Sequence, residues 1–377
     1  MRTFAPATGA RSPEVVPRRR IACVYKRDEC ADLVVGGMDY LRFFRMSEAL
    51  ASRGHQVDII LNRRRDPVTL GRRLREVPFR VVRWDHYDVV KTFFHDGFET
   101  LLTEGGGDHP FILSKLGSVV GRDQTPGVHF FREVREQLFQ TQQKIARRSR
   151  GVTVLTRPSR DLWRREHGTT SPLFEVPTGV DAEIPPLGGN PYRSVGVEEP
   201  VVLYAGNLYL KKHQPEVNKL WQDRLNRLGW SLRRRGLRLV AMGRGETELL
   251  DPRAVLHVGV VECRAFWDWQ RHAAVGVVLA QGPVQDNESS KIYYYLRTGL
   301  PVICERPVPN AWLIEQTHHG ALVDYDDVES LAEAASWFTA RPPQRGGVID
   351  YMIDRHSWAH RARLYDAVLA EAGDGSE

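Results

Sequence analysis

The sequence predicts an α/β protein with two domains in tandem, each built on a parallel sheet, and a ligand-binding cleft between them. Its 377 residues exceed what one ordinary core contains. Apolar runs rich in β-branched residues alternate with amphipathic stretches, a pattern typical of parallel strands covered by helices on both faces. A segment rich in proline and glycine, 182–200, divides the chain almost in half. Because open α/β sheets bind ligands at the carboxyl ends of their strands, two such halves predict a cleft where those ends face each other.

The order of the elements follows from these runs. Strands are predicted at 21–25, 56–61, 79–83, 88–93, 111–114, 151–156, 201–205, 237–242, 275–280 and 301–304. Helices are predicted at 39–53, 129–147, 159–167, 215–235, 262–272, 290–298, 327–340 and 356–371, the last after an irregular stretch at 341–349. The segments expected from this order are a disordered leader at 1–18, a first domain at 19–183, a linker at 184–199 and a second domain at 200–345.

Composition excludes several classes of protein. Hydrophobic residues make up 42% of the chain and charged residues 27%, as in globular proteins. The longest clean apolar run, 273–280, is much shorter than a membrane helix, and no apolar segment follows the N-terminal arginines as in a secretory signal. The four cysteines lack the paired spacing of a zinc site, and Cys23 and Cys304 fall in apolar strands. We therefore expect a reduced, cytoplasmic protein without a membrane span.

Positive charge is carried mostly by arginine. The formal net charge is +6, and only eight of the 53 basic residues are lysine. Arginine clusters recur at 18–20, 63–65, 72–75, 147–150 and 233–235. A solvated surface is the commoner explanation of such clusters, and attraction to a nucleotide phosphate, an acidic membrane face or nucleic acid is the alternative. Aromatic residues do not alternate with the clusters, so we expect no nucleic-acid partner.

The segment 286–303 predicts an anion site. Ser289 or Ser290 suits the N-cap of a helix, and Gly299 suits the position beyond its end. Free N–H groups at a helix start attract anions, whereas the cation of Lys291 in the first turn is unfavourable unless an anion is bound there. A surface lysine beside a structural cap is the alternative. The three tyrosines at 293–295 cannot share one helix face, and we expect Tyr294 to point to the cleft.

The opening of the second domain carries a weaker signal for an anion. The strand at 201–205 ends before Gly206, which permits a tight turn and close approach of the backbone. Lys211 or Lys212 then follows within reach of an anion. The two glycines of 239–245 do not complete the fingerprint of a dinucleotide site, so we interpret that segment as a strand-end turn.

The first domain offers fewer signals. Gly36 and Gly37 precede the helix at 39–53, where a glycine pair lets a ligand approach the backbone, and a plain turn explains the pair equally well. Side chains of this half that can accept a proton from a substrate hydroxyl are Asp39, His95, Asp96 and Asp123. For any single one of them a surface or hydrogen-bonded role is the simpler interpretation.

Four segments together resemble one family. EALASRGHQVDII at 48–60 is similar to its first-domain helix and return strand, and EVPTGVD at 175–181 resembles its PNGVD stretch before the linker. YAGNLYLKK at 204–212 is similar to its GRL…K opening of the second domain. SKIYYYLRTGLPVI at 290–303 resembles its K-x-x-E-Y-x-x-x-G-x-PVI helix. The family is the GT-B glycosyltransferases of the family 4-like group, and the resemblance extends over about residues 20–340.

This resemblance implies two Rossmann-like domains, with a nucleotide-sugar bound mainly by the second and the last helix crossing back onto the first. Lys212 and Lys291 would hold the diphosphate, and Val258 and Gly259 would lie near the base. All the residues implied to form the donor site are Gly206, Asn207, Lys212, Val258, Gly259, Asp286, Glu288, Ser289, Ser290, Lys291 and Tyr294. The amides of Ser289 and Ser290 would contribute to diphosphate binding.

The sequence departs from the family pattern at informative positions. Asn207 replaces an arginine, and the paired glutamates of the family fall on Asp286 and Tyr294. The second glutamate usually holds the ribose, so Tyr294 changes that contact, and Glu288 is the candidate to replace part of it. A residue other than glutamate at the position of Tyr294 also occurs in a glucuronosyltransferase-like branch with inverting chemistry. The stereochemistry of transfer is therefore open.

We expect a glycosyltransferase that moves a sugar from a nucleoside-diphosphate donor to a hydroxyl. No DxD pair follows a strand, so no obligatory metal is expected, and the base for the acceptor would be Asp123, His95 or Asp96. A nucleotide-sugar epimerase on the same fold, a binding protein and a nicotinamide dehydrogenase are the alternatives. The acceptor is open: a basic first-domain face at Arg63–Arg65, Arg72, Arg73 and Arg75 would suit a lipid-linked acceptor at the inner membrane surface, and a small soluble acceptor fits equally well.

Overall fold

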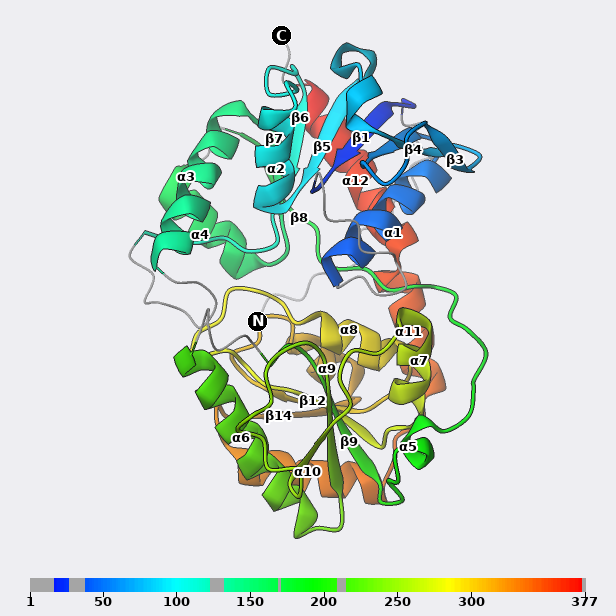
Figure 1. Cartoon of the computed structure of the whole chain (residues 1–377), viewed down its shortest axis with the longest axis vertical. Helices are drawn as coiled ribbons and strands as arrows, with labels where there is room; N and C mark the ends of the chain where they lie inside the picture. The colour runs from blue at the N-terminus through cyan, green and yellow to red at the C-terminus, as the bar shows by residue number, and fades with distance from the viewer. Residues whose placement is uncertain (1–16, 27–37, 123–131, 169–170, 209–214, 375–377) are drawn as a thin grey trace.

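The chain folds into two α/β sandwiches that are joined by two crossings of the chain (Figure 1). The computed structural model describes residues 17–26, 38–122, 132–168, 171–208 and 215–374. Each sandwich has a sheet of mainly parallel strands between two layers of helices. The predicted fold class is therefore confirmed. No helix in the described ranges combines the length and the apolar character needed to cross a membrane.

The first sheet occupies the N-terminal half. Its strands are β1 (Arg20–Val24), β2 (Gln56–Ile60), β3 (Val68–Gly71), β4 (Leu74–Val77), β5 (Val89–Phe93), β6 (Ile112–Lys115), β7 (Gly151–Val154) and β8 (Leu173–Glu175). Among the described residues their order is β3-β4-β2-β1-β5-β6-β7-β8, and the β3–β4 pair is antiparallel while the others are parallel. One face is covered by α1 (Met38–Ser52) and α12 (Trp358–Asp374). The other face is covered by α2 (Phe94–Thr103), α3 (Arg132–Arg148) and α4 (Arg157–His167).

The second sheet is entirely parallel within the described residues. Its strands are β9 (Val201–Ala205), β10 (Arg238–Met242), β11 (Val255–His257), β12 (Val275–Val278), β13 (Val302–Glu305) and β14 (Gly320–Val323), in the order β11-β10-β9-β12-β13-β14. One face is covered by α6 (Pro215–Arg233) and α10 (Val328–Ala340). The other is covered by α5 (Pro191–Ser194), α7 (Cys263–His272), α8 (Ser290–Arg297), α9 (Trp312–Thr317) and α11 (Gly346–His356).

Both sheets have a point at which the winding direction reverses. β1 lies between β2 and β5, and β9 lies between β10 and β12. In open α/β sheets the crevice outside the carboxyl ends at such a point is where ligands bind. The segments that leave β9 and β12 there carry Gly206 and Lys291, so the fold brings two predicted site residues to the same crevice.

The two chain crossings lie side by side. Val180, on the first crossing, donates from its N–H to the carbonyl of His356 at 2.9 Å and accepts from the N–H of Trp358 at 3.0 Å. Arg297 donates to the carbonyls of Asp181 and Ala182 at 2.7 and 2.6 Å. The C-terminal helix α12 then packs on α1 in the first domain. The segment after Val180 is therefore fixed by hydrogen bonds to its carbonyls, although its composition is that of a linker.

Two predictions of local structure are wrong. Residues 79–83 do not form a strand: Phe79–Val81 is a short 3-10 turn, followed by another at Trp84–His86. Pro78 precedes the turn, and the N–H of Phe79 donates to the side chain of Asn62, which diverts the backbone from pairing. The stretch at 341–349 is not irregular throughout, because α11 begins at Gly346 and packs its buried Val348 and Met352 into the core on the same face of the second sheet as α8.

Candidate functional site

The carboxyl ends of β9, β10 and β11 form an edge lined by glycine. The N–H of Gly206 donates to the carbonyl of Met242 at 2.8 Å, and the N–H of Gly243 donates to that of Gly259 at 2.9 Å. Gly243 and Gly259 have positive φ angles of 141° and 74°, which favour glycine. A Cβ on Gly243 would overlap the carbonyl of Gly206. This edge, which also contains Val258, therefore presents backbone rather than side chains to a ligand.

Lys291 lies over this edge from the first turn of α8. Its side chain reaches back to Gly206, where an added Cβ would lie 2.6 Å from Lys291 Cε, and its Nζ is 5.5 Å from the centre of the Tyr204 ring. Burial lowers the pKa of Lys291 to about 8. None of the carboxylates that the structure describes forms an ion pair with it. A half-buried cation without an acidic partner at a switch point is suited to bind an anion.

The start of α8 is held by a neighbouring loop. Ser289 occupies the N-cap position, but its side chain accepts no capping hydrogen bond. Its N–H donates to Asn310 Oδ1 at 2.8 Å, and Asn310 Nδ2 donates to its carbonyl at 3.0 Å. The Ser289 hydroxyl is buried and has no hydrogen-bond partner in the described part of the chain. At Ser289 the amide is thus already occupied and the hydroxyl is the group left to a ligand or water, while Ser290 is partly exposed.

The loop before α8 contacts the first domain directly. The carbonyl of Asp286 accepts from the hydroxyls of Thr156 and Ser159, at 2.6 and 3.0 Å, at the N-terminus of α4. Asn287 Nδ2 donates to Ser118 Oγ at 2.7 Å. Ser118 follows β6, and Thr156 and Ser159 follow β7, so all three lie at the carboxyl edge of the first sheet. The loop before α8, which is part of the predicted donor site, therefore joins the two domains through hydrogen bonds at this point.

Glu288 extends the same bridge to the chain crossing. The side chain is 8% exposed, its Oε1 accepts the N–H of Thr178 at 2.8 Å, and its Oε2 accepts the hydroxyl of Tyr293 at 2.9 Å. Both oxygens thus hold protein groups at the domain junction, and the contact of Glu288 with a ribose stays a prediction.

The three successive tyrosines are all buried. Tyr293 faces Glu288, and Tyr295 accepts the N–H of Ala205 at 2.9 Å through its hydroxyl. Tyr294, 2% exposed, packs 5.5 Å from the ring of Trp267. Burial and the nearby carboxylate of Asp181 raise its pKa well above the ordinary value. Tyr294 therefore faces the junction between the domains, where it is covered.

The two described base candidates differ in environment. His95, in the first turn of α2, is 7% exposed, and its Nε2 has no hydrogen-bond partner among the described residues. Burial lowers its pKa to about 4, so the imidazole is neutral at pH 7. Asp96 is exposed and lies 3.5 Å from Lys26 Nζ. His95 is in the right protonation state to accept a proton, and Asp96 has the better access to solvent.

The turn between β5 and α2 is strained. Phe94 has a φ of 61°, a left-handed conformation that is rare for a bulky residue. Its ring lies against Gly117, where an added Cβ would be 2.7 Å away. Such strain is found where the surrounding structure requires it, often beside functional groups, and here it immediately precedes His95.

Several predicted residues lie outside the described ranges. They are Gly36, Gly37, Asp123, Lys211, Lys212 and the side chain of Asp39. Asn207 is described: it is exposed, and its carbonyl accepts the hydroxyl of Tyr204 at 3.3 Å. Across the part of the chain that is described, no three histidine, cysteine, aspartate or glutamate side chains gather as metal ligands would.

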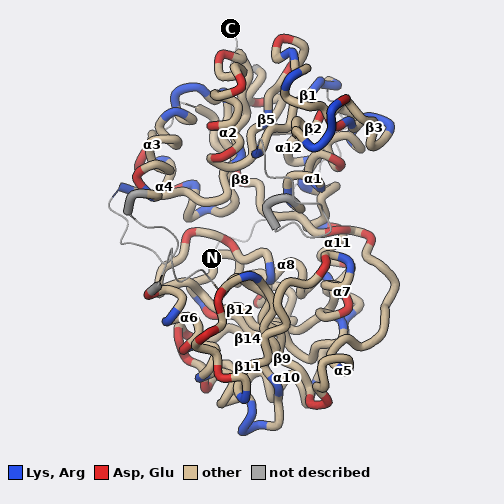
Figure 2. Tube along the Cα trace, in the orientation of Figure 1, with Lys and Arg blue, Asp and Glu red and all other residues tan. Residues whose placement is uncertain are grey.

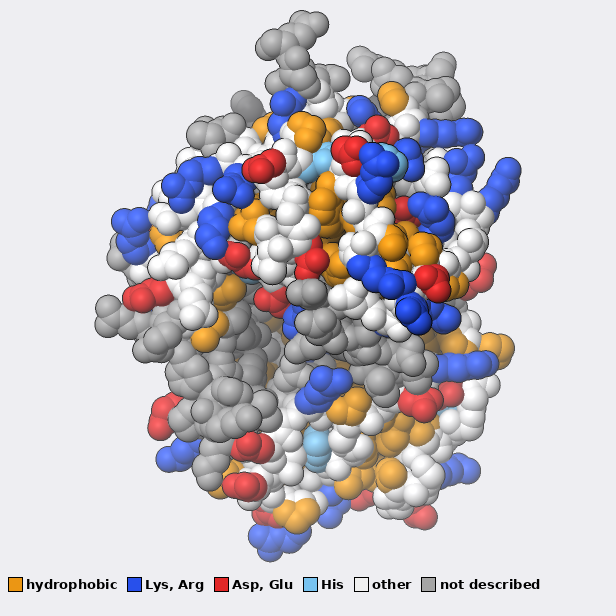
Figure 3. Space-filling view, turned by 45° about the horizontal axis from the view of Figure 1, so that its top comes forward, with side chains coloured by type: hydrophobic (Ala, Val, Ile, Leu, Met, Phe, Trp, Pro, Cys, Tyr) orange, Lys and Arg blue, Asp and Glu red, His pale blue; other side chains and the backbone are white. Residues whose placement is uncertain are grey.

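The basic face of the first domain is partly neutralised. Arg63 is paired with the buried Glu76, and Arg75 with the buried Asp58 at 2.5 Å. Around β3 the arginines appear as blue segments (Figure 2), and acidic side chains lie between the basic ones on the visible surface (Figure 3). The arginines of this face that form no ion pair in the described ranges are Arg64, Arg65, Arg72 and Arg73.

Sequence reasoning missed the ionic group beneath the glycine-lined edge. Arg224 on α6 and Glu305 at the end of β13 form an ion pair at 2.5 Å and are 1% and 0% exposed. A glutamate that ends an otherwise apolar strand is the available sequence signal, since a buried carboxylate requires a partner.

Comparison with known proteins finds similar structures but no similar sequence. No protein-family model matches the sequence, and no curated protein matches it by sequence. Sucrose-phosphate synthase of Thermosynechococcus elongatus has a similar structure, with 15% identity, a TM-score of 0.66 and coverage of 95% of this chain and 100% of that one. Anabaena Alr3699/HepE, solved with UDP-glucose, has 11% identity, a TM-score of 0.67 and coverage of 94% and 100%. AviGT4, a glycosyltransferase involved in avilamycin A biosynthesis, has 17% identity, a TM-score of 0.62 and coverage of 95% and 99%.

These likenesses cover nearly the whole of each chain. The chain therefore has the GT-B fold, as the resemblance of its motifs implied.

Proposed function

We propose that the protein is a glycosyltransferase that moves a sugar from a nucleoside-diphosphate donor to an acceptor hydroxyl. The observation that carries the proposal is Lys291, a partly exposed cation without a carboxylate partner in the described residues, above a glycine-lined edge at the switch point of the second sheet. The similar HepE structure solved with UDP-glucose supports a nucleotide-sugar as the ligand class.

In the proposed reaction the bond between the anomeric carbon and the β-phosphate oxygen breaks, and a bond to the acceptor oxygen forms. The electron pair of the broken bond goes to the diphosphate, whose charge is stabilised by the ammonium of Lys291. Lys212 is proposed to assist from the loop after β9. The glycine-lined edge lets the backbone approach the nucleotide closely. Dependence on a metal is tested by turnover in EDTA, which we expect to leave the rate unchanged.

We propose that the acceptor proton goes to Asp123, His95 or Asp96. Variants Asp123→Asn, His95→Gln and Asp96→Asn identify the base. Its variant should lose about 100-fold or more in kcat while its affinity for the nucleoside diphosphate is unchanged. If none of the three variants loses kcat, the leaving phosphate itself is the proton acceptor, as a retaining enzyme would allow.

We also propose that the unpaired arginines near β3 hold the enzyme at an anionic membrane surface, where a lipid-linked acceptor would be found. Basic residues attract such a surface by about 1 kcal/mol each. Sedimentation with vesicles containing phosphatidylserine should carry down the protein at low salt and release it at high salt. Equal binding to neutral vesicles would show that the arginines are not what holds the protein at the membrane. No binding to either kind of vesicle would favour a small soluble acceptor.

The donor class is tested by thermal unfolding with UDP, GDP, dTDP, ADP or NAD at millimolar concentration. A ligand at 100 times its Kd adds about 2.7 kcal/mol, which raises Tm by a few degrees. We expect one nucleoside diphosphate to raise Tm, Lys291→Ala to abolish the shift, and Lys219→Ala, an exposed lysine on α6, to retain it. A shift with NAD alone would overturn the proposal, and turnover of the donor without acceptor would point to an epimerase.

A further inference from the structure

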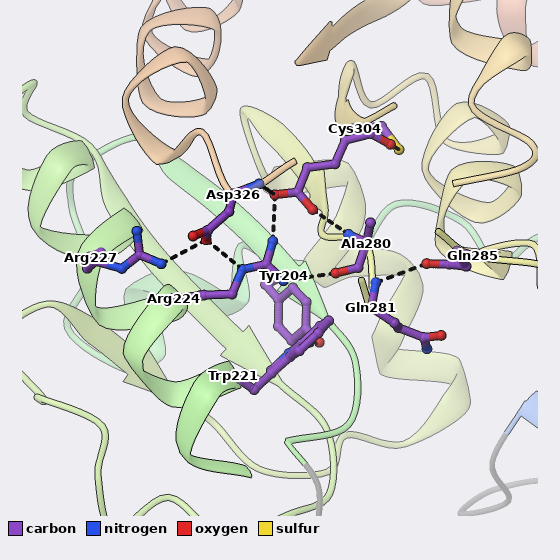
Figure 4. A network of polar contacts seen from close by, with 10 residues as sticks. Tyr204, Trp221, Arg224, Arg227, Ala280, Gln281, Gln285, Cys304 and Asp326 are labelled. Carbon is purple, nitrogen blue, oxygen red and sulfur yellow. Dashed lines mark hydrogen bonds and ion pairs between the residues drawn. The ribbon is translucent and has the colours of Figure 1, made fainter. Parts of the chain in front are cut away.

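Arg224 and Glu305 form a buried ionic group, and Figure 4 shows the contacts of Arg224 with Asp326 and Ala280. Its contacts reach the loop before α8 and the turn after β9, which are the two walls of the proposed donor site. Arg224 and Glu305 are almost completely buried, and the guanidinium also donates to Asp326 Oδ1 at 2.9 Å. Arg227 donates to the same oxygen at 2.7 Å from the exposed side of α6. The group therefore connects the surface of α6 with the carboxyl ends of β13 and β14.

One branch of the group fixes the beginning of the loop before α8. Glu305 Oε2 accepts the N–H of Ala280 at 2.6 Å, and Arg224 Nη1 donates to the carbonyl of the same residue at 2.8 Å. Both backbone groups of Ala280 are thus held by the two partners of one ion pair. Ala280 follows β12 and begins the segment that leads through Asp286 to Lys291.

That segment has a second fixed point. Gln285 Oε1 accepts the N–H of Gln281 at 3.0 Å, and its Nε2 donates to the carbonyl of Asn287 at 2.5 Å. The glutamine fixes the loop internally, whereas the ion pair fixes it to the sheet. The ion pair therefore fixes the start of the loop to the sheet, while Ser289 and Asn310 hold its end at α8.

A second branch reaches the wall after β9. The guanidinium of Arg224 lies 5.3 Å from the centre of the Trp221 ring, and Trp221 Nε1 donates to the hydroxyl of Tyr204 at 2.6 Å. That hydroxyl lies 3.3 Å from the carbonyl of Asn207, and the Tyr204 ring is the one over which Lys291 lies. Arg224 thus supports the turn at Gly206 as well as the loop before α8.

Stability alone does not account for this arrangement. Burying two charges costs several kcal/mol each, and well-packed apolar side chains of similar volume are often as stable. We propose that Arg224 and Glu305 are positioning residues that hold the two walls of the donor site at the separation a diphosphate requires. The identity of the ligand, a nucleoside diphosphate, rests on the proposed function. The role of Arg224 and Glu305 rests on the contacts described above.

The test compares Arg224→Met with Arg238→Met. Arg238 is a matched control because it is 8% exposed, lies in the same domain and donates to the carbonyls of Pro252 and Arg253 at 2.7 and 2.5 Å. It begins β10 and so lies at the opposite end of the sheet from the donor site. Two quantities are measured on the full chain: the Kd of the diphosphate that stabilises the wild type, and amide hydrogen exchange over 280–289 without ligand.

If Arg224 holds the walls of the donor site in place, Arg224→Met should weaken diphosphate binding at least tenfold. It should also speed amide hydrogen exchange over 280–289. Arg238→Met should lose stability but keep Kd within about twofold and leave that exchange unchanged, since it touches neither wall. Arg224→Lys, which keeps the charge but loses the fork geometry, should fall between wild type and Arg224→Met. It replaces Arg224→Met in both measurements if the methionine variant does not fold.

Equal effects of the Arg224 and Arg238 variants on both measurements would overturn the positioning role. Failure of the proposed function is distinguishable, because the wild type would then bind no nucleoside diphosphate. The exchange comparison would still decide whether the ion pair holds the loop.

Discussion

The two edges that face each other across the cleft handle charge in opposite ways. On the second-domain edge Lys291 is partly exposed, has no carboxylate partner in the described residues, and lies above glycine backbone. On the first-domain edge the two described base candidates differ from it: His95 is neutral at pH 7, and Asp96 lies 3.5 Å from the ammonium of Lys26. The first arrangement gains free energy when an anion arrives, because a desolvated cation then acquires a partner.

This difference indicates how each edge recognises its substrate. A diphosphate has the same charge and shape whatever sugar it carries, so cations and exposed backbone can bind it without contacts to the sugar. Around His95 and Asp96 the imidazole is neutral and the carboxylate already has a cation beside it, so we expect recognition there to depend more on shape and neutral hydrogen bonds. We therefore expect substitutions at the two edges to separate donor binding from acceptor use.

The largest expected effect comes from adding a methyl group to each edge. Gly243→Ala places a Cβ on the carbonyl of Gly206 in a conformation unfavourable to alanine, which should destabilise the protein by about 3 kcal/mol and displace the donor edge. A displacement near 1 Å should weaken nucleoside-diphosphate binding about 100-fold. Isothermal titration calorimetry measures the Kd of the nucleoside diphosphate, and urea unfolding measures the loss of stability.

Gly117→Ala is the matched substitution on the first-domain edge, where the methyl group would contact the ring of Phe94. It should cost about 1–3 kcal/mol of stability and impair acceptor use, with diphosphate affinity unchanged. Equal losses of diphosphate affinity in both variants would show that the two edges do not act separately.

The next effect is on stability in acid. Burial holds the pKa of His95 at about 4, below its ordinary value of 6.5, so the unfolded chain binds a proton that the folded chain does not. The stabilisation is complete above pH 6.5 and is lost as pH falls towards 4, by about 3 kcal/mol. His95→Gln should lessen this loss in urea unfolding at pH 7 and pH 4.5. An unchanged pH dependence would mean that the imidazole is protonated in the folded protein.

The fold was more predictable than the site for a physical reason. Buried parallel strands appear in a sequence as continuous apolar runs. Such runs predict β9, β10 and β12. The segment 79–83 also contains two valines and a phenylalanine, but Pro78 and a hydrogen bond between Phe79 and the side chain of Asn62 divert its backbone from pairing. Three of the four residues of the short edge strand β3 are exposed, so no continuous buried apolar run marks it in the sequence.

Within the site, local chemistry was predictable and long-range contacts were not. Lys291 could be recognised because a cation in the first turn of a helix opposes the helix dipole. Glu288 could not be placed, since its partner Thr178 is 110 residues away in the chain. The same holds for Arg224 and Glu305, which are 81 residues apart. A sequence shows that a buried charge needs a partner without showing which residue the fold supplies.

A smaller effect concerns the pH dependence of donor binding. Because burial lowers the pKa of Lys291 to about 8, the ammonium that attracts the diphosphate is lost above that pH. The Kd should be constant below pH 7.5 and then rise, by up to about tenfold per pH unit. Lys291→Arg should flatten the profile, since arginine stays protonated, and comparison of the two proteins cancels titration of the nucleotide itself. The same rise in both proteins would assign the dependence to another group.

The smallest expected effect distinguishes a junction residue from a donor ligand at Glu288. Glu288→Gln keeps an oxygen for the N–H of Thr178 and an amide for the hydroxyl of Tyr293, so stability should change by less than about 1 kcal/mol. Glu288→Ala leaves both buried groups unpaired and should cost about 1–3 kcal/mol in urea unfolding. Diphosphate affinity should stay within twofold in Glu288→Gln. A tenfold loss there, without loss of stability, would return Glu288 to the ribose contact that the family resemblance implied.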